Sequence, residues 1–159
     1  MKEVNIYTDG SSKGNPGPGG YGTILIYKEN RKELSNGFRC TTNNRMELLA
    51  VVEGLKALKY PCKVNVYSDS KYVVDAFNEG WLQAWQSNGW KKKDKKTVLN
   101  IDLWEQVIKL INVHQVAFIW VKGHSDNTEN EKCDLLAVKA ACRVNLPIDI
   151  EYEKLTNNS

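Results

Sequence analysis

The sequence contains no long hydrophobic run, and this absence argues against a membrane-spanning protein. Among its 159 residues the longest apolar stretches are strand-sized, such as residues 23–27, whereas a spanning helix needs roughly 20 apolar residues. The first residues carry one lysine and no apolar segment, so we expect no signal peptide. The hydrophobic content is 42% and the net charge is only +3, which is unlike the composition of a disordered chain. We therefore expect one soluble globular domain over residues 1–159.

Cysteine and histidine are too few and too scattered to indicate a zinc site or a disulfide framework. The four cysteines form no Cys-x-x-Cys pair, and the two histidines are His114 and His124. Cys133 and Cys142 fall in one expected helix, about half a turn out of phase, so they cannot share a metal ion. Free thiols are typical of a reducing compartment, and we expect a cytoplasmic protein.

The order of the expected elements indicates an α/β fold. Three strands precede the first helix, and each of the two later strands follows helices, which predicts a mixed five-stranded sheet flanked by helices. The first three strands are then antiparallel, and the last two are parallel to strand 1. The expected strands are 4–9, 21–28, 34–40, 64–69 and 115–122, and the expected helices are 43–59, 71–78, 81–87, 98–112 and 131–144. Either Asn43 or Asn44 is expected to cap the first helix. The core then spans about residues 1–145, followed by a tail over about 146–159.

The glycine-rich segment 10–20 is expected to be a loop, and its overlap with a dinucleotide fingerprint is misleading. Residues 17–22 match G-x-G-x-x-G. That motif requires a helix directly after it, whose N-terminus faces the pyrophosphate. Here the next residues are the strand formers of 23–27, and two prolines interrupt the loop. We interpret the segment as a turn between strands.

A short internal repeat places two aspartates in matched positions. The segment Val4–Asp9 reads Val-Asn-Ile-Tyr-Thr-Asp, and Val64–Asp69 reads Val-Asn-Val-Tyr-Ser-Asp. Because a hairpin and a helix connect the two strands, they are parallel if they share a sheet. As neighbours they would lie about 5 Å apart, with Asp9 and Asp69 at the same edge. Ligands bind at this edge in open α/β sheets.

Two further acids fall close to the same edge. Glu47 and Asp134 each lie in the first turn of an expected helix, near the residues that face the sheet. Singly, an acid in a first turn is most simply explained by the helix dipole. Four converging carboxylates repel one another and require a cation, for which oxygen ligands favour Mg²⁺ or Mn²⁺. This arrangement is typical of a two-metal phosphoryl-transfer site.

The positive charge is concentrated in one segment. Residues 81–100 contain five lysines and one aspartate, giving 5 − 1 = +4, so the rest of the chain sums to −1. Three of the five tryptophans lie in or beside this run. Lysines neutralise phosphates and tryptophans pack on sugars or bases, so the combination indicates a nucleic-acid surface. Two simpler explanations remain open: a lysine run that serves only solubility, and a role of Trp81 and Trp85 limited to attaching a helix to the core.

Together these motifs resemble type 1 ribonuclease H, and the bacterial members with a basic protrusion in particular. The resemblance runs from about residue 4 to residue 144, with the blocks in the family's order and spacing. The blocks are Asp9–Ser12, Gly14–Gly22, Thr41–Glu47, Ser68–Ser70, Trp120–His124 and Glu129–Asp134. The resemblance implies the ribonuclease H fold and cleavage of the RNA strand of RNA–DNA hybrids, leaving 5′-phosphate and 3′-hydroxyl ends.

Carried over to this chain, the resemblance also implies roles for individual residues. The metal ligands would be Asp9, Glu47, Asp69 and Asp134, holding two Mg²⁺ ions in the substrate complex, and His124 would assist proton transfer or product release. Hybrid contacts would come from a group at the glycine-rich loop and the first helix, from Lys71 at the start of the second expected helix, and from the protrusion over about 81–97. These residues are Gly10, Asn15, Thr42, Asn43, Asn44, Lys71, Trp81, Trp85, Trp90, Lys91, Lys92, Lys93, Lys95 and Lys96.

Two positions depart from the pattern of the bacterial relatives, and rival functions stay open. Lys71 stands where many relatives have glutamine, and Asp126 adds an acid to the loop after His124. The alternatives are a hybrid-binding module that does not cut, a strand-transfer domain of the integrase type, and a Ca²⁺-binding structural protein. We expect a monomer without an obligate protein partner and without membrane contact.

Overall fold

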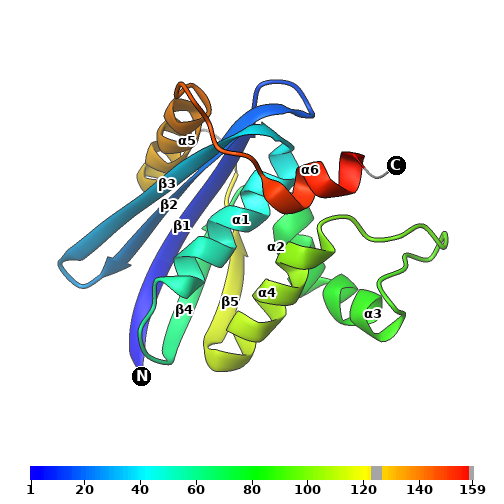
Figure 1. Ribbon diagram of the computed structural model, residues 1–159. Coiled ribbons are helices and arrows are strands. Elements are labelled where there is room, and N and C mark those ends of the chain that lie inside the picture. The colour runs from blue at the N-terminus through cyan, green and yellow to red at the C-terminus, as the bar shows by residue number, and fades with distance from the viewer. Residues whose placement is uncertain (123–126, 158–159) are drawn as a thin grey trace.

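A computed structural model describes residues 1–122 and 127–157, in which the strands form one five-stranded sheet in the order β3-β2-β1-β4-β5 (Figure 1). The strands are β1 (Lys2–Ser12), β2 (Gly17–Tyr27), β3 (Asn30–Thr41), β4 (Cys62–Ser68) and β5 (Gln115–Trp120). The helices are α1 (Asn43–Lys56), α2 (Lys71–Asn78), α3 (Trp81–Ser87), α4 (Ile101–Val113), α5 (Thr128–Ala141) and α6 (Ile150–Asn157).

The internal repeat in the sequence corresponds to the register of the two central strands. β1 and β4 pair in parallel with Val4 opposite Val64 and Tyr7 opposite Tyr67. The pairs β1–β2 and β2–β3 are antiparallel, and β4–β5 is parallel. The predicted mixed sheet is therefore confirmed. One detail differs, since β1 does not end at Asp9 but continues beside β2 to Ser12.

Helices α1 and α5 cover opposite faces of the sheet. Thr23 in β2 faces α1, where its hydroxyl donates to the carbonyl of Ala50 at 2.7 Å. Gly22 has the opposite orientation because side chains alternate along a strand, and a Cβ there would lie 2.2 Å from the carbonyl oxygen of Cys133 in α5. The main core lies on the α1 side and includes Ile6, Val51, Leu55, Val64, Val66 and Trp104.

The close approach of α5 explains where the expected loop was wrong. We predicted a loop over 10–20, but β1 extends to Ser12 and β2 begins at Gly17. The glycines that looked like loop residues form a strand surface on which a helix backbone rests, since a Cβ at Gly20 would lie 2.6 Å from the carbonyl oxygen of Ala137. Glycine is thus required here by packing and not by turn geometry.

Several predicted helix boundaries were also shifted. Thr42, and neither Asn43 nor Asn44, is the N-cap of α1, because its hydroxyl accepts from the backbone N–H of Arg45. Asn127 caps α5, so this helix begins three residues earlier than expected. Short polar side chains at these positions satisfy the first N–H groups of each helix.

The C-terminal segment, for which no element was predicted, contains α6. Arg39 on β3 forms an ion pair with Glu153 at 2.8 Å, and the backbone N–H of Arg39 donates to the carbonyl of Pro147. The carboxylate of Asp149 is buried at the start of this helix, where it accepts from Arg45 and Thr41. The segment is therefore docked onto the sheet and the first helix.

Two further features concern properties expected from composition. The four cysteines, all within the described residues, are free thiols. In residues 1–122 and 127–157, no helix combines the length and the hydrophobicity that crossing a bilayer requires.

Candidate active site

Three carboxylates meet where the pairing of β1 and β4 ends. Asp9 lies in β1, two residues beyond the last β1–β4 pair, and Asp69 directly follows β4. Glu47 comes from the second turn of α1, not from the first as expected. One oxygen from each of these residues lies within 4.8 Å of the others. The structure thus brings together three of the four predicted ligands.

Gly10 explains how a helix residue reaches the sheet at this point. A Cβ on Gly10 would lie 2.3 Å from the backbone nitrogen of Glu47 and 2.5 Å from the backbone carbon of Met46. Only glycine therefore permits α1 to rest on β1 here. The N–H of Gly10 donates to Oδ1 of Asp9 at 2.9 Å, so this amide is engaged within the site.

Burial makes the cluster electrostatically costly when no cation is bound. Burial raises the pKa of Asp9 to about 7, and the charges of Asp69 and Asp134 add to the rise. Burial likewise raises the pKa of Glu47 well above its usual value, with a further contribution from Asp9. The Oε2 atom of Glu47 is buried and finds no hydrogen-bond partner among the described residues. An all-oxygen site with excess negative charge and an unpaired buried oxygen fits a divalent cation.

Asp134 lies close to this group without belonging to it. It is half-buried in the second turn of α5, not in the first as expected, because the helix starts at Thr128. Its charge contributes to the raised pKa of Asp9. Asp134 is thus placed at the border of the three-carboxylate group. His124 and Asp126 lie outside the described residues.

Lys71 and Trp120 lie next to Asp69. The ammonium of Lys71 is 4.0 Å from the centroid of the Trp120 ring, and the indole N–H of Trp120 donates to the backbone carbonyl of Asp69 at 3.3 Å. Trp120 was not singled out from the sequence as a functional residue, although it opens one of the recognised blocks. The pair presents a cation and an exposed aromatic ring at the edge of the cluster.

The N-terminus of α1 gathers several predicted hybrid contacts. The side-chain oxygen of Asn15 accepts from the backbone N–H of Asn43 at 3.1 Å, and Thr42 caps the helix. Asn43 and Asn44 are exposed and lie about one helical turn before Glu47. These polar groups therefore lie on the surface beside the carboxylates.

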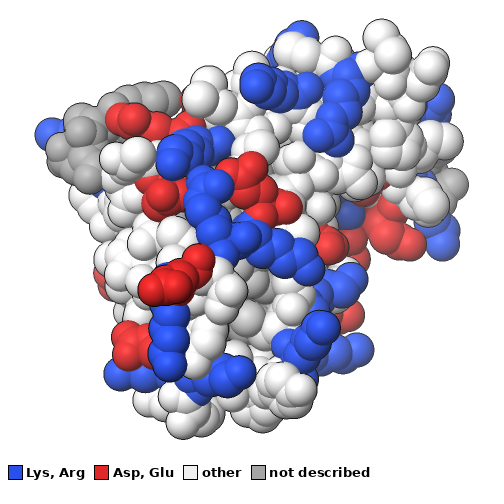
Figure 2. All heavy atoms as spheres, turned by 90° about the vertical axis from the view of Figure 1, so that its left-hand side faces the viewer, with Lys and Arg blue, Asp and Glu red and all other residues white. Residues whose placement is uncertain are grey.

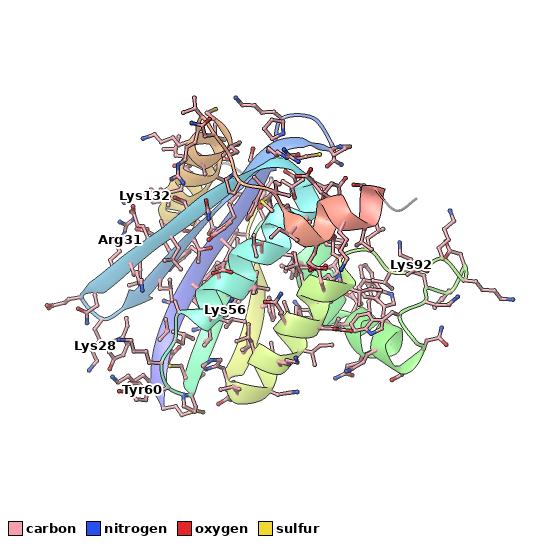
Figure 3. All side chains as sticks on the ribbon, viewed as in Figure 1. Lys28, Arg31, Lys56, Tyr60, Lys92 and Lys132 are labelled. Atoms are coloured by element: carbon pink, nitrogen blue, oxygen red, sulfur yellow. The ribbon has the colours of Figure 1, made fainter. Side chains whose placement is uncertain are left out.

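The lysine-rich segment projects from the body as α3 and the loop after it (Figure 1). All five lysines are exposed, and Figure 3 places Lys92 on the opposite side of the molecule from Arg31 and Lys132. Trp85 and Trp90 pack partly against the core, with Trp85 in an edge contact to Trp104 at 5.8 Å. Trp81 is 43% exposed and is the most open of the three tryptophans.

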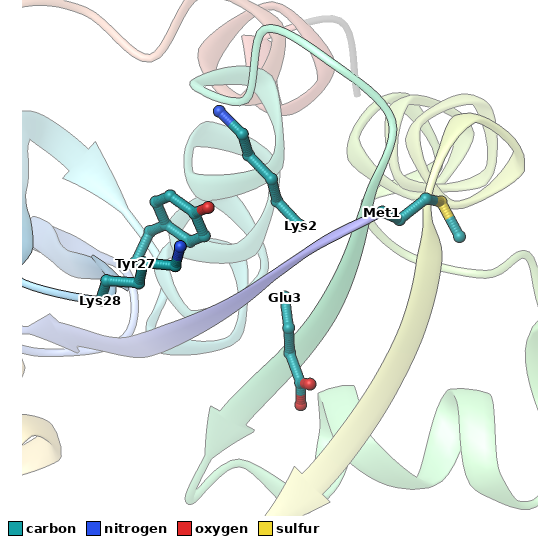
Figure 4. A pocket seen from close by; sticks show the side chains of 5 residues that line it. All are labelled: Met1, Lys2, Glu3, Tyr27 and Lys28. Carbon is teal, nitrogen blue, oxygen red and sulfur yellow. The ribbon is translucent and has the colours of Figure 1, made fainter.

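Other charged surfaces differ from this segment. On the side that carries the β2–β3 hairpin and α5, basic side chains alternate with acidic ones (Figure 2), and Arg31 and Lys132 both pair with Glu129. A hollow of about 610 Å³ is lined by Met1, Lys2, Glu3, Tyr27 and Lys28 (Figure 4). It lies where β1 begins, at the other end of the sheet from the carboxylates.

Asn130 is a site neighbour that sequence reasoning missed. Its side-chain NH₂ donates to the carbonyls of Thr8 and Tyr67, the residues that precede Asp9 and Ser68. Asn130 lies inside the recognised block Glu129–Asp134, but nothing in its sequence neighbours indicates these contacts.

The strand order, together with carboxylates where the two central parallel strands separate, defines a protein of the ribonuclease H-like class. The RNase H family model matches residues 1–142. The chain is 57% identical to a ribonuclease H of Desulforamulus reducens, with 94% of each chain covered. It is 56% identical to that of Syntrophus aciditrophicus, covering 96% of this chain and 88% of the relative.

The comparison with solved structures agrees. The crystal structure of LC9-RNase H1, a type 1 RNase H, superposes with a TM-score of 0.79 at 34% identity, covering 89% of this chain and 72% of that one. The chain therefore belongs to the ribonuclease H family.

Proposed function

We propose that this protein is a metal-dependent endonuclease that hydrolyses the RNA strand of RNA–DNA hybrids, leaving 5′-phosphate and 3′-hydroxyl ends. The observation that carries the proposal is the group of Asp9, Glu47 and Asp69, with oxygens within 4.8 Å of one another and with Asp9 and Glu47 buried, in a chain of the ribonuclease H family. The raised pKa values of Asp9 and Glu47 mark this group as unstable without a cation.

The donor set supports Mg²⁺ as the cofactor, with Mn²⁺ as a substitute and two ions bound in the substrate complex. Asp9, Glu47, Asp69 and Asp134 would hold the ions, because all four offer hard carboxylate oxygens. When bound, such ions lower the pKa of water and stabilise the charge on the attacking and leaving oxygens. The unpaired oxygen of Glu47 is available as a ligand without breaking an existing hydrogen bond among the described residues.

The chain's own residues would orient the hybrid. The shallow minor groove of a hybrid exposes 2′-hydroxyls, and the exposed amides of Asn43 and Asn44 lie beside the carboxylates to contact it. Asn15 and Thr42 at the N-terminus of α1 would hold a phosphate of the DNA strand, since a helix N-terminus favours anions.

The protrusion would grip the DNA strand outside the site. Its five exposed lysines supply the charge that neutralises phosphates, and Trp81 offers the most accessible ring for packing on a sugar or base. Lys71, held over Trp120, would contact a phosphate near the scissile bond. His124 would assist proton transfer or product release. We further propose that residues 1–159 act as a single-domain monomer.

The proposal is tested with four end-labelled duplexes: RNA–DNA, RNA–RNA, DNA–DNA, and DNA that contains one ribonucleotide. Each is incubated with Mg²⁺ or with EDTA. We expect cutting of the RNA strand of the RNA–DNA hybrid with Mg²⁺, and none with EDTA. Hybrid binding without cutting in either Mg²⁺ or Mn²⁺ would instead identify a binding module of the same fold.

A further inference from the structure

Asn130 occupies the point where the two carboxylate-bearing strands separate. The pairing of β1 with β4 ends at Tyr7 and Tyr67. The side-chain NH₂ of Asn130 donates to the carbonyl of Thr8 at 3.2 Å and to the carbonyl of Tyr67 at 3.1 Å. One amide therefore bridges β1 and β4, one residue before Asp9 and two residues before Asp69.

The contacts determine the orientation of this amide. Both partners are carbonyl oxygens, which only accept hydrogen bonds, so the NH₂ end must face them. The Oδ1 atom is then turned away, and it is buried with no partner in the part of the chain that the structure describes. A buried acceptor without a partner lowers the stability of the fold, so the bridge is made at a cost.

The backbone that carries Asn130 is itself held in place. The N-cap side chain of Asn127 accepts from the backbone N–H groups of Glu129 and Asn130. One turn further along α5, the thiol of Cys133 donates to the carbonyl of Tyr7 at 3.2 Å. Helix α5, which also carries Asp134, is thereby attached to the ends of both strands.

We propose that Asn130 is a positioning residue that sets the relative placement of Asp9, Asp69 and Asp134 for metal binding. This inference rests on the proposed function, because it assumes that the carboxylates hold a divalent ion. Asn130 touches the backbones that carry two of these residues and lies on the helix that carries the third. Residues that orient metal ligands from outside typically change metal affinity about 10–100-fold when replaced.

The test measures Mg²⁺ and Mn²⁺ binding by calorimetry for Asn130→Ala and Asn130→Asp, at a temperature where each variant is folded. We expect both variants to bind at least about tenfold more weakly than the wild type. The direction in which Asn130→Asp changes the metal affinity is informative, since an added negative charge that acted only through space would tighten cation binding. The control is Ala140→Gly, buried and ten residues further along the same helix, which should lower the melting temperature because glycine disfavours a helix, and leave metal affinity unchanged.

The outcomes separate this inference from the proposed function. Wild-type metal affinity in both Asn130 variants, with wild-type binding and cleavage intact, would overturn the positioning role alone. Unchanged metal affinity together with a lowered melting temperature would show that Asn130 only stabilises the fold, and it would also overturn the positioning role. A wild-type protein that neither binds Mg²⁺ nor cuts the hybrid would overturn both proposals.

Discussion

Replacing Asp149 with alanine removes one of two carboxylates that hold the buried guanidinium of Arg45. The Nε atom of Arg45 donates to Asp149 at 2.7 Å, and its Nη2 atom lies 2.6 Å from Asp102. The side chains of Arg45 and Asp149 are only 4% and 8% exposed. Asp149 also accepts from the hydroxyl of Thr41 at 2.9 Å. The substitution therefore leaves two buried donors without this partner.

The expected loss follows from the burial of the pair. Breaking a buried ion pair costs about 3–5 kcal/mol. Arg45 keeps Asp102, whose side chain is 24% exposed, so we expect the lower end, about 3 kcal/mol. For a chain of this length, each kcal/mol lowers the melting temperature by about 2–4 °C, which gives a decrease of about 6–12 °C.

The assay is urea unfolding followed by circular dichroism, with Glu151→Ala as the control. Glu151 lies in α6, two residues after Asp149, and is exposed, so its replacement should change the free energy of unfolding by less than about 0.5 kcal/mol. A loss below about 1 kcal/mol for Asp149→Ala would refute the reasoning, since the desolvation of the pair would then cancel its attraction.

Four other outcomes are expected. Asp9→Asn should abolish cleavage and raise the melting temperature in EDTA at pH 8. Because burial raises the pKa of Asp9 in the folded protein to about 7, this gain in melting temperature should shrink towards pH 4. A lower melting temperature for Asp9→Asn at pH 8 would contradict this reasoning. Alanine at the five lysines of 91–96 should weaken hybrid binding and flatten its salt dependence, whereas an unchanged salt slope would exclude phosphate contact. Gly10→Ala should lower the melting temperature and Mg²⁺-dependent cleavage together, because the new Cβ would lie 2.3 Å from a backbone nitrogen of α1; a wild-type melting temperature would oppose this. Burial lowers the pKa of His114, whose Nδ1 accepts a hydrogen bond from the backbone N–H of Cys62, so the stability of the protein should fall as the pH drops below about 6.5. Between pH 7 and pH 5, His114→Asn should lose less stability than the wild type does.

The central part of the fold was predictable because its signal is local. The repeat of Val4–Asp9 in Val64–Asp69 indicates both the alternation and the register of two adjacent strands. The structure pairs the two segments in this register from Val4–Val64 to Tyr7–Tyr67. Strand β2 was harder, since the glycines at its start look like loop residues until α5 is known to rest on them.

The C-terminal helix had a local signal that was not used. Asp149 precedes a segment with Glu151 and Glu153 in its first turn, which is a typical helix start. Its docking could not be read from the sequence, since Asp149 contacts Arg45 from 104 positions away along the chain.

The carboxylates were found because two of them, Asp9 and Asp69, end the two matched segments of the repeat. The role of Asn130 depends on carbonyls 122 and 63 positions away, and backbone carbonyls carry no sequence signal. Contacts of this kind become visible only when the helix and both strands are placed together.

The most direct test of the proposed activity compares the wild type with Asp69→Asn on one RNA–DNA hybrid in Mg²⁺, with binding and cleavage measured on the same samples. If the carboxylates act as metal ligands for hydrolysis, Asp69→Asn binds the hybrid with an affinity similar to that of the wild type and does not cut the RNA strand. Cleavage by Asp69→Asn at a rate near that of the wild type would contradict the assignment of this site.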